Sequence, residues 1–183
     1  MLLRNHFHAG YCTNIHPGED WEATFSALRQ HVPGIRDRLG AGKGLGLGLR
    51  LSDTASRELG EGADLISFRD WLASEGLYVF TMNGFPYGAF HGTRVKDRVH
   101  HPDWTTPERL DYTLRLFRQL QVLLPEGMEG GISTSPVSYR HWYTSEADRD
   151  RVLRRGAQQM AEVAAALWKV RKEQGADLHL DIE

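Results

Sequence analysis

Ionisable and apolar side chains alternate in the last seven residues of the chain, 177–183, and this pattern is its strongest chemical signal. His179, Asp181 and Glu183 occupy every second position, with Leu180 and Ile182 between them. Because successive side chains of a β-strand point to opposite faces, the three polar side chains share one face. Barrel enzymes keep their chemistry at the C-terminal ends of parallel strands. The segment therefore predicts a strand whose polar face meets a site.

Short polar pairs end three other apolar segments of the chain. The members of each pair are two residues apart, so both side chains share a face of the expected strand. The pairs are Asn14 with His16, Thr81 with Asn83, and Ser133 with Ser135. Parallel strands present their C-terminal ends at one edge of a sheet, so these pairs predict a polar cluster at that edge.

Two of these residues also have simple structural interpretations. His16 precedes Pro17 and Gly18, so it binds a metal or substrate, or else it caps the next helix or bonds to a neighbouring loop. Asn83 precedes Gly84, and Asn-Gly is typical of turns, so it binds a ligand or only makes the turn. The sequence leaves both pairs of alternatives open.

Arg50 ends a strand-like segment in which glycines and leucines alternate. It faces the same way as Gly46 and Gly48, which predicts a position inside a barrel. Glycine within a strand usually marks a close approach of another group or a bend at a barrel corner. Arg50 is therefore a candidate for binding a ligand.

A long loop follows the third expected strand and reaches residue 102. Loops of this length inside compact domains are commonly functional or disordered, and the aromatic residues in this one argue against disorder. His91, Arg94 and Lys96 lie close together in it. They predict binding of an anionic or sugar-like ligand, with a solvated loop as the alternative.

Strand and helix signals alternate strictly along the chain. We expect strands at 11–16, 45–51, 77–82, 130–135 and 177–183. We expect helices at 21–39, where Pro33 kinks or splits the helix, at 54–59 with 65–74, at 105–124, and from 144 or 145 to 170. Thr105 and Glu108 have the spacing of a capping box. The order predicts a parallel sheet built from right-handed crossovers.

Two architectures fit this order of elements. A doubly wound sheet of five strands would be complete at this length, whereas a (β/α)8 TIM barrel needs about 250 residues. The central strands of a doubly wound sheet are covered on both faces and read as apolar throughout. Because several strands here carry polar residues on one face, we favour the barrel, with the chain covering strands 1–5 and helices 1–4.

Several sequence motifs resemble one bacterial family. They are Tyr11–Glu19, Gly46–Ser52, Phe80–Lys96, Gly131–Thr134 and Asp181–Glu183. Together they resemble the metabolite traffic protein EboE family, which belongs to the xylose isomerase-like TIM barrel superfamily. The resemblance covers the whole chain and implies a single domain, residues 1–183, that is the N-terminal portion of such a barrel.

The resemblance also implies a function. It places Glu183 where the superfamily has the first of its metal-binding carboxylates, at the end of strand five. A divalent metal, Mg²⁺ or Mn²⁺ with Zn²⁺ or Co²⁺ as alternatives, would then support isomerisation or epimerisation of a sugar-like substrate. The family is associated with moving small-molecule precursors across the bacterial inner membrane. A barrel that binds a metabolite or a membrane-protein partner without catalysis is the alternative.

These arguments give a defined set of expected roles. Glu183 and His91 are expected to be catalytic, with Glu183 also binding the metal. The expected substrate-binding residues are Asn14, His16, Arg50, Asn83, Arg94 and Lys96. The open edges of the first and last strands also suggest a homodimer that completes the barrel.

Composition narrows the class of protein. The 183 residues are 40% hydrophobic and 25% charged with a formal net charge of −2, which is typical of one soluble domain. Basic residues are scattered among acidic ones, so nucleic acid is not an expected partner. The single cysteine, Cys12, excludes an internal disulfide and suits the cytoplasm. No signal peptide or apolar span of about 20 residues is evident.

Overall fold

The computed structural model describes residues 2–3, 7–39, 44–89 and 96–183. Its elements are, in chain order, β1 (Leu2–Leu3), β2 (Phe7–His8), β3 (Gly10–Cys12), η1 (Thr13–Ile15), α1 (Trp21–Arg38), β4 (Leu45–Arg50), α2 (Asp53–Leu59), α3 (Ala63–Ser74), β5 (Leu77–Asn83), η2 (Lys96–His100), α4 (Pro107–Leu123), β6 (Gly130–Thr134), η3 (Arg140–Trp142), α5 (Glu146–Gln174) and β7 (Leu178–Ile182). The alternation of strands and helices matches the order that the sequence predicts.

Five strands form one parallel sheet in the order β3-β4-β5-β6-β7. The spatial order is the sequence order, so the described sheet has no point at which the order reverses. A doubly wound sheet requires such a reversal. The parallel α/β sheet predicted from the sequence is thus confirmed.

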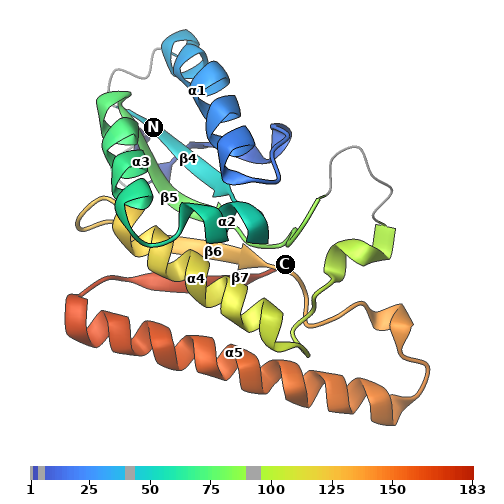
Figure 1. Ribbon diagram of the computed structural model, residues 1–183. Coiled ribbons are helices and arrows are strands. Elements are labelled where there is room, and N and C mark those ends of the chain that lie inside the picture. The colour runs from blue at the N-terminus through green and yellow to red at the C-terminus, as the bar shows by residue number, and fades with distance from the viewer. Residues whose placement is uncertain (1, 4–6, 40–43, 90–95) are drawn as a thin grey trace.

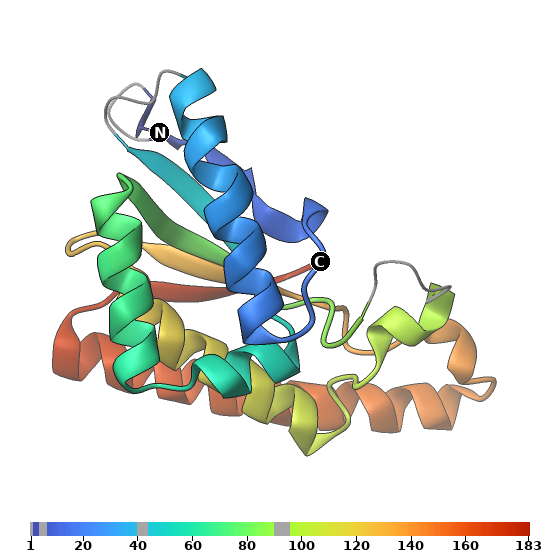
Figure 2. The same cartoon turned by 45° about the horizontal axis from the view of Figure 1, so that its top comes forward.

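The helices lie along one face of this sheet (Figures 1 and 2). Right-handed crossovers between neighbouring strands taken in sequence order place every connecting helix on the same side. The face turned away from these helices is called the open face below. The ends of the strands are called upper where the strands finish and lower where they begin.

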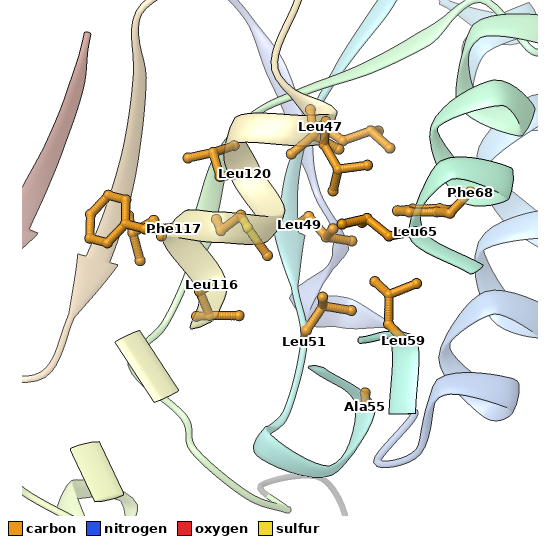
Figure 3. Close-up of a cluster of buried hydrophobic side chains, with 14 of the residues drawn as sticks. Leu47, Leu49, Leu51, Ala55, Leu59, Leu65, Phe68, Leu116, Phe117 and Leu120 are labelled. Atoms are coloured by element: carbon orange, nitrogen blue, oxygen red, sulfur yellow. The ribbon is translucent and has the colours of Figure 1, made fainter. Parts of the chain in front are cut away.

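The leucines of β4 form part of the hydrophobic core between the sheet and the helices. Leu45, Leu47 and Leu49 are almost completely buried, whereas Gly46 and Gly48 alternate with them on the open face. Figure 3 shows Leu47, Leu49 and Leu51 packed between side chains of α3 and α4. The apolar stripes of the helices therefore meet the apolar positions of the strands in one core.

Two details of the helices differ from the sequence predictions. α1 runs without interruption through Pro33, so of the two predicted effects, a kink or a split, the split is wrong. α4 begins with Pro107 at its first position after Thr106, and no side chain caps it, so the predicted capping box of Thr105 and Glu108 is also wrong. The hydroxyl of Thr105 instead donates to Asp103 Oδ1 at 2.5 Å, and its backbone N–H donates to the same oxygen.

A short antiparallel pair, β1 with β2, was not predicted from the sequence. His8 of β2 lies against the sheet, with its Nδ1 2.9 Å from the hydroxyl of Tyr78 and its ring 5.6 Å from that of Phe80, centre to centre. The pair therefore contacts the lower part of the open face, where both aromatic rings lie.

Candidate functional site

Cross-strand register places the polar side chains of the open face in two rows. The first row runs across all five strands through Cys12, Gly48, Thr81, Gly131 and His179. The second row lies nearer the upper end and runs through Arg50, Asn83, Ser133 and Asp181. Thr81, Asn83, Ser133, His179 and Asp181 are far apart in sequence and thus share one face. The predicted strand over residues 11–16 is shorter, however, because β3 ends at Cys12, and the pair Asn14 and His16 lies in and just after η1.

An upper hollow of about 250 Å³ lies over these rows. Its hydrogen-bonding lining consists of Cys12, Thr81, Asn83 and Ser133, and the ring of Phe80 supplies an apolar wall. Gly48 lines it as well, and a Cβ there would come only into ordinary contact with Thr81, 3.4 Å from its methyl group. The hollow is small and mixed in polarity, as suits a small polar ligand.

A bulge in β5 puts two consecutive residues, Phe80 and Thr81, on the open face. The pairing of β4 with β5 skips Phe80, because Leu47 pairs with Val79 and Gly48 with Thr81. One extra residue in a strand resets the alternation of side chains and often re-aims them beside functional sites. Phe80 and Thr81 consequently both line the open face.

A larger lower hollow, about 630 Å³, adjoins the upper one and shares Phe80 and Thr81 with it. His8 and His179 line it, together with Glu129 from the turn between α4 and β6. His179 Nε2 lies 3.3 Å from Asp181 Oδ2, and its Nδ1 lies 3.3 Å from Glu129 Oε1. The imidazole is therefore flanked by two carboxylates.

The backbone of Arg50 lies in the second row, but its side chain binds the loops beyond the upper ends of the strands. The guanidinium donates to the backbone oxygens of Gly18 and Gly88, at 3.2 and 2.7 Å, and pairs with the carboxylate of Glu19 at 3.3 Å. Only 3% of the side chain is exposed. These contacts join the loop after β3 to the loop after β5, so Arg50 positions the rim of the site.

His16 lies on the helix side of β3 and away from the rows. Its Nε2 is 2.9 Å from the hydroxyl of Tyr11, and its ring stacks on His31 of α1 with ring centres 4.8 Å apart. Burial raises the pKa of Tyr11, with Cys12 adding to the effect. These contacts favour the interpretation of His16 as a residue that bonds to neighbouring elements.

The other predicted binding residues do not gather at one place. Asn83 lies in the upper hollow, and its Oδ1 also accepts the backbone N–H of Phe85 at 2.9 Å, so it makes the turn as well. Asn14 lies in η1, and its Oδ1 is buried without a hydrogen-bond partner among the described residues. Lys96 is exposed at the start of η2. His91 and Arg94 lie outside the described residues.

Glu183 follows β7 and extends its pairing, because its backbone N–H donates to the carbonyl of Thr134 at 3.0 Å. Its side chain is exposed. A divalent cation needs several oxygen or nitrogen ligands around one point. Within the described ranges no three His, Cys, Asp or Glu side chains gather closely enough to hold a metal ion. The metal set expected around Glu183 is therefore not assembled by these residues, and no chemical step is assigned to it.

Arg109 of α4 anchors the loop that follows the upper end of β5. This completely buried arginine donates to the carbonyls of Gly84, Phe85 and Pro102 at 2.6, 3.1 and 2.7 Å. Burial lowers the pKa of its guanidinium. The guanidinium thus supplies hydrogen-bond donors to three backbone oxygens and holds the chain just beyond β5 in place.

Histidine and aromatic rings join this loop to the one that follows β6. His100 of η2 lies between Phe85 and Tyr139, with ring centres 5.3 and 5.1 Å away. His101 stacks on Trp142 at 4.3 Å, and the Trp142 indole donates to Asp97 Oδ2 at 2.8 Å, which lowers the pKa of that carboxyl. These contacts between partly exposed rings connect the two loops beside the strand ends.

Sequence reasoning did not identify Phe80 as part of the site. The signal for it was present in Gly46, because the predicted close approach at this glycine is the approach of the Phe80 ring. Glu129 was missed as well, and nothing in its turn sequence distinguishes it from an ordinary solvent-facing acid.

Comparisons with protein-family models, with curated proteins and with solved structures found no match. Among the helices in the described part of the chain, none combines the length and the apolar character that crossing a membrane requires.

Proposed function

We propose that this protein binds a small, hydroxyl-bearing metabolite on the open face of its sheet. The upper hollow carries the proposal, since it places side-chain donors and acceptors of three strands, β3, β5 and β6, around a space beside an aromatic ring. Hydroxyl and amide side chains both donate and accept, as hydroxyl groups of a ligand require. The polar wall and the apolar wall together suit a sugar-like molecule with a hydroxylated side and a C–H side.

The strand order and the one-sided helices support a barrel of the TIM type as the complete architecture. The resemblance to the EboE family points in the same direction and adds a finer proposal, a metal-dependent isomerase or epimerase in metabolite traffic. The alternative is a barrel that binds a metabolite, or a membrane-protein partner of an export pathway, without catalysis. The two metabolite-binding forms share the site and differ only in turnover.

The first experiment is ligand binding measured by saturation-transfer NMR and calorimetry. The probes are D-xylose, D-ribose, D-glucose, xylitol, dihydroxyacetone, glycolaldehyde and glyceraldehyde. We expect at least one to bind, and Gly48→Ala to weaken that binding more than tenfold, because its methyl group enters the hollow without a clash. Gly34→Ala is the matched control, since a Cβ at Gly34 meets nothing within 4 Å. Equal binding by both variants, or no binding by the native protein, would disprove the proposed site.

A further inference from the structure

We propose that a pocket beside the start of α5 binds a small carboxylic acid with an apolar body. The pocket lies between the loop that follows β6 and the first turns of α5, and its volume is about 290 Å³. Ligand pockets of proteins run from about 300 to 1,000 Å³, so its occupant is small. Among the described residues, the pocket shares none of its lining with either hollow of the open face, so it is a second site.

The walls of this pocket are mostly apolar. Val137 of the loop and Val152 and Leu153 of α5 line it, together with Tyr143. Leu153 is 56% exposed, so the protein leaves a large apolar side chain uncovered at the pocket. A ligand that covers this side chain removes apolar surface from water, which is favourable. The pocket therefore suits an apolar molecule.

Close packing between the loop and α5 builds the pocket. Val137 lies against Gly156 of α5, where a Cβ would stand 2.4 Å from Val137 Cγ1. Gly156 is buried, and any larger residue would push the loop away from the helix. The carbonyl of Val137 also accepts the backbone N–H of Trp104 at 3.0 Å. The loop is thus held beside α5 by the fold itself.

The hydroxyl groups of the lining already have partners within the protein. Ser138 donates to Asp103 Oδ2, and the hydroxyl of Tyr143 lies 3.5 Å from the same oxygen. Asp103 is only 2% exposed, so both hydroxyls face a buried carboxylate. Hydroxyls that are engaged in this way are poor partners for a ligand. The pocket is therefore unsuited to a sugar.

Two arginines line the pocket and are also exposed, which places them at its mouth. They are Arg140, at the start of η3, and Arg149, in the first turns of α5. Arg149 Nε donates to the carbonyl of Tyr143 at 3.2 Å, and this bond holds the guanidinium beside the pocket. In the described part of the chain, neither arginine forms an ion pair with a carboxylate.

The acidic residues on either side of Arg149 have other partners. Asp148 pairs with Arg151 at 3.0 Å, and Asp150 lies 3.9 Å from Arg154. Two cations thus border an apolar pocket, and an anionic group complements their charge. A carboxylate is planar and accepts two parallel hydrogen bonds from the fork of a guanidinium. The ligand class is therefore an apolar body in the pocket with a carboxylate at the mouth.

Binding of octanoate, measured by calorimetry and by NMR, tests this site. Octan-1-ol and octylamine are the comparison probes, because they keep the apolar body and change the charge. We expect octanoate to bind and to shift the signals of Val137, Val152 and Leu153. Octan-1-ol should bind at least about tenfold more weakly, and octylamine should not bind. Added NaCl should weaken octanoate binding, because salt screens exposed charges.

Substitutions separate the roles of charge and apolar surface. Arg149→Met should lower octanoate affinity about fivefold and leave octan-1-ol binding unchanged, since only the charge is lost. Arg154→Met, at an exposed position of the same helix outside the pocket lining, is the matched control. Leu153→Ser should weaken the binding of both probes. Leu39→Ser, which removes a leucine of nearly equal exposure (55%) just after α1, should weaken neither.

Several results would overturn the proposed carboxylate site. They are absence of octanoate binding, equal binding of octanoate and octan-1-ol, signal shifts confined to residues outside the pocket, or unchanged affinity in Arg149→Met. Each of them leaves the metabolite site on the open face unaffected, because the sugar probes report on that site and octanoate reports on this one.

Discussion

The ring of Phe80 lies against the bare backbone of Gly46: a Cβ on Gly46 would stand 2.7 Å from Phe80 Cε1. The same ring atom would be 2.7 Å from a Cβ on Gly10. Two glycines on neighbouring strands therefore accept one aromatic side chain on the open face. The ring lines both hollows of the open face and lies between the upper and the lower one.

Gly46→Ala should therefore destabilise the protein by about 1–3 kcal/mol, because the new methyl group overpacks the contact with Phe80. Urea denaturation measures this change in the free energy of unfolding. In a Phe80→Ala background the same substitution should cost much less, since the clashing ring is gone. Equal costs in the two backgrounds would show that the contact does not explain the glycine.

Arg50→Met should lower stability by about 2–3 kcal/mol, since it removes a charged donor from two backbone oxygens and from Glu19. Arg50→Lys should recover only part of this loss, because an ammonium lacks the fork that reaches both loops. Arg69→Met, which removes an exposed ion pair with Asp70, should change stability little. A stable Arg50→Met variant that binds the metabolite poorly would instead support the sequence prediction of direct ligand binding.

His100 should make stability depend on pH. Burial, helped by Arg109 and His101, lowers its pKa below the ordinary 6.5, although Asp97 and Asp103 act in the opposite direction. The unfolded chain then binds a proton more readily than the folded one, so stability falls as pH drops below about 6.5 towards the folded pKa. The fall comes from His100 being held neutral between two aromatic rings.

Thermal unfolding between pH 5 and 7.5 measures this dependence. His100→Gln should flatten the acid side of the profile, whereas His141→Gln should leave it unchanged, because His141 is exposed. An acid slope that is identical in His100→Gln and in the native protein would assign the dependence to other groups.

The metal expected at Glu183 remains a prediction with its own test. If Glu183 is a ligand, Glu183→Gln should weaken Mn²⁺ binding by about tenfold or more, because a carboxylate supplies charge that an amide does not. Electron paramagnetic resonance of free Mn²⁺ measures the affinity. Glu173→Gln, at an exposed position near the end of α5, is the control. Unchanged affinity in Glu183→Gln would remove this residue from any metal site.

The sequence by itself determined the order of the helices and parallel strands and the face on which the residues of β4 and β7 lie. Local alternation was sufficient for this, as with Leu45, Leu47 and Leu49 between glycines, and for His179 and Asp181 sharing one face. The start of the last helix at 144 or 145 was also predicted, and the Ser145 hydroxyl caps that helix by accepting the N–H of Asp148. These features depend on neighbours within a few residues, which a sequence displays directly.

Only the tertiary structure decided which polar residues form the site. Arg50 was expected beside a ligand, but its partners Gly18 and Gly88 are 32 and 38 residues away in the chain and hold it on the loops. The ring of His16 stacks on that of His31, and a bulge that alternation cannot reveal puts both Phe80 and Thr81 on the open face. Hydrogen-bonding groups satisfy whichever partners folding brings near, so long-range packing determines which of them remain available to a ligand.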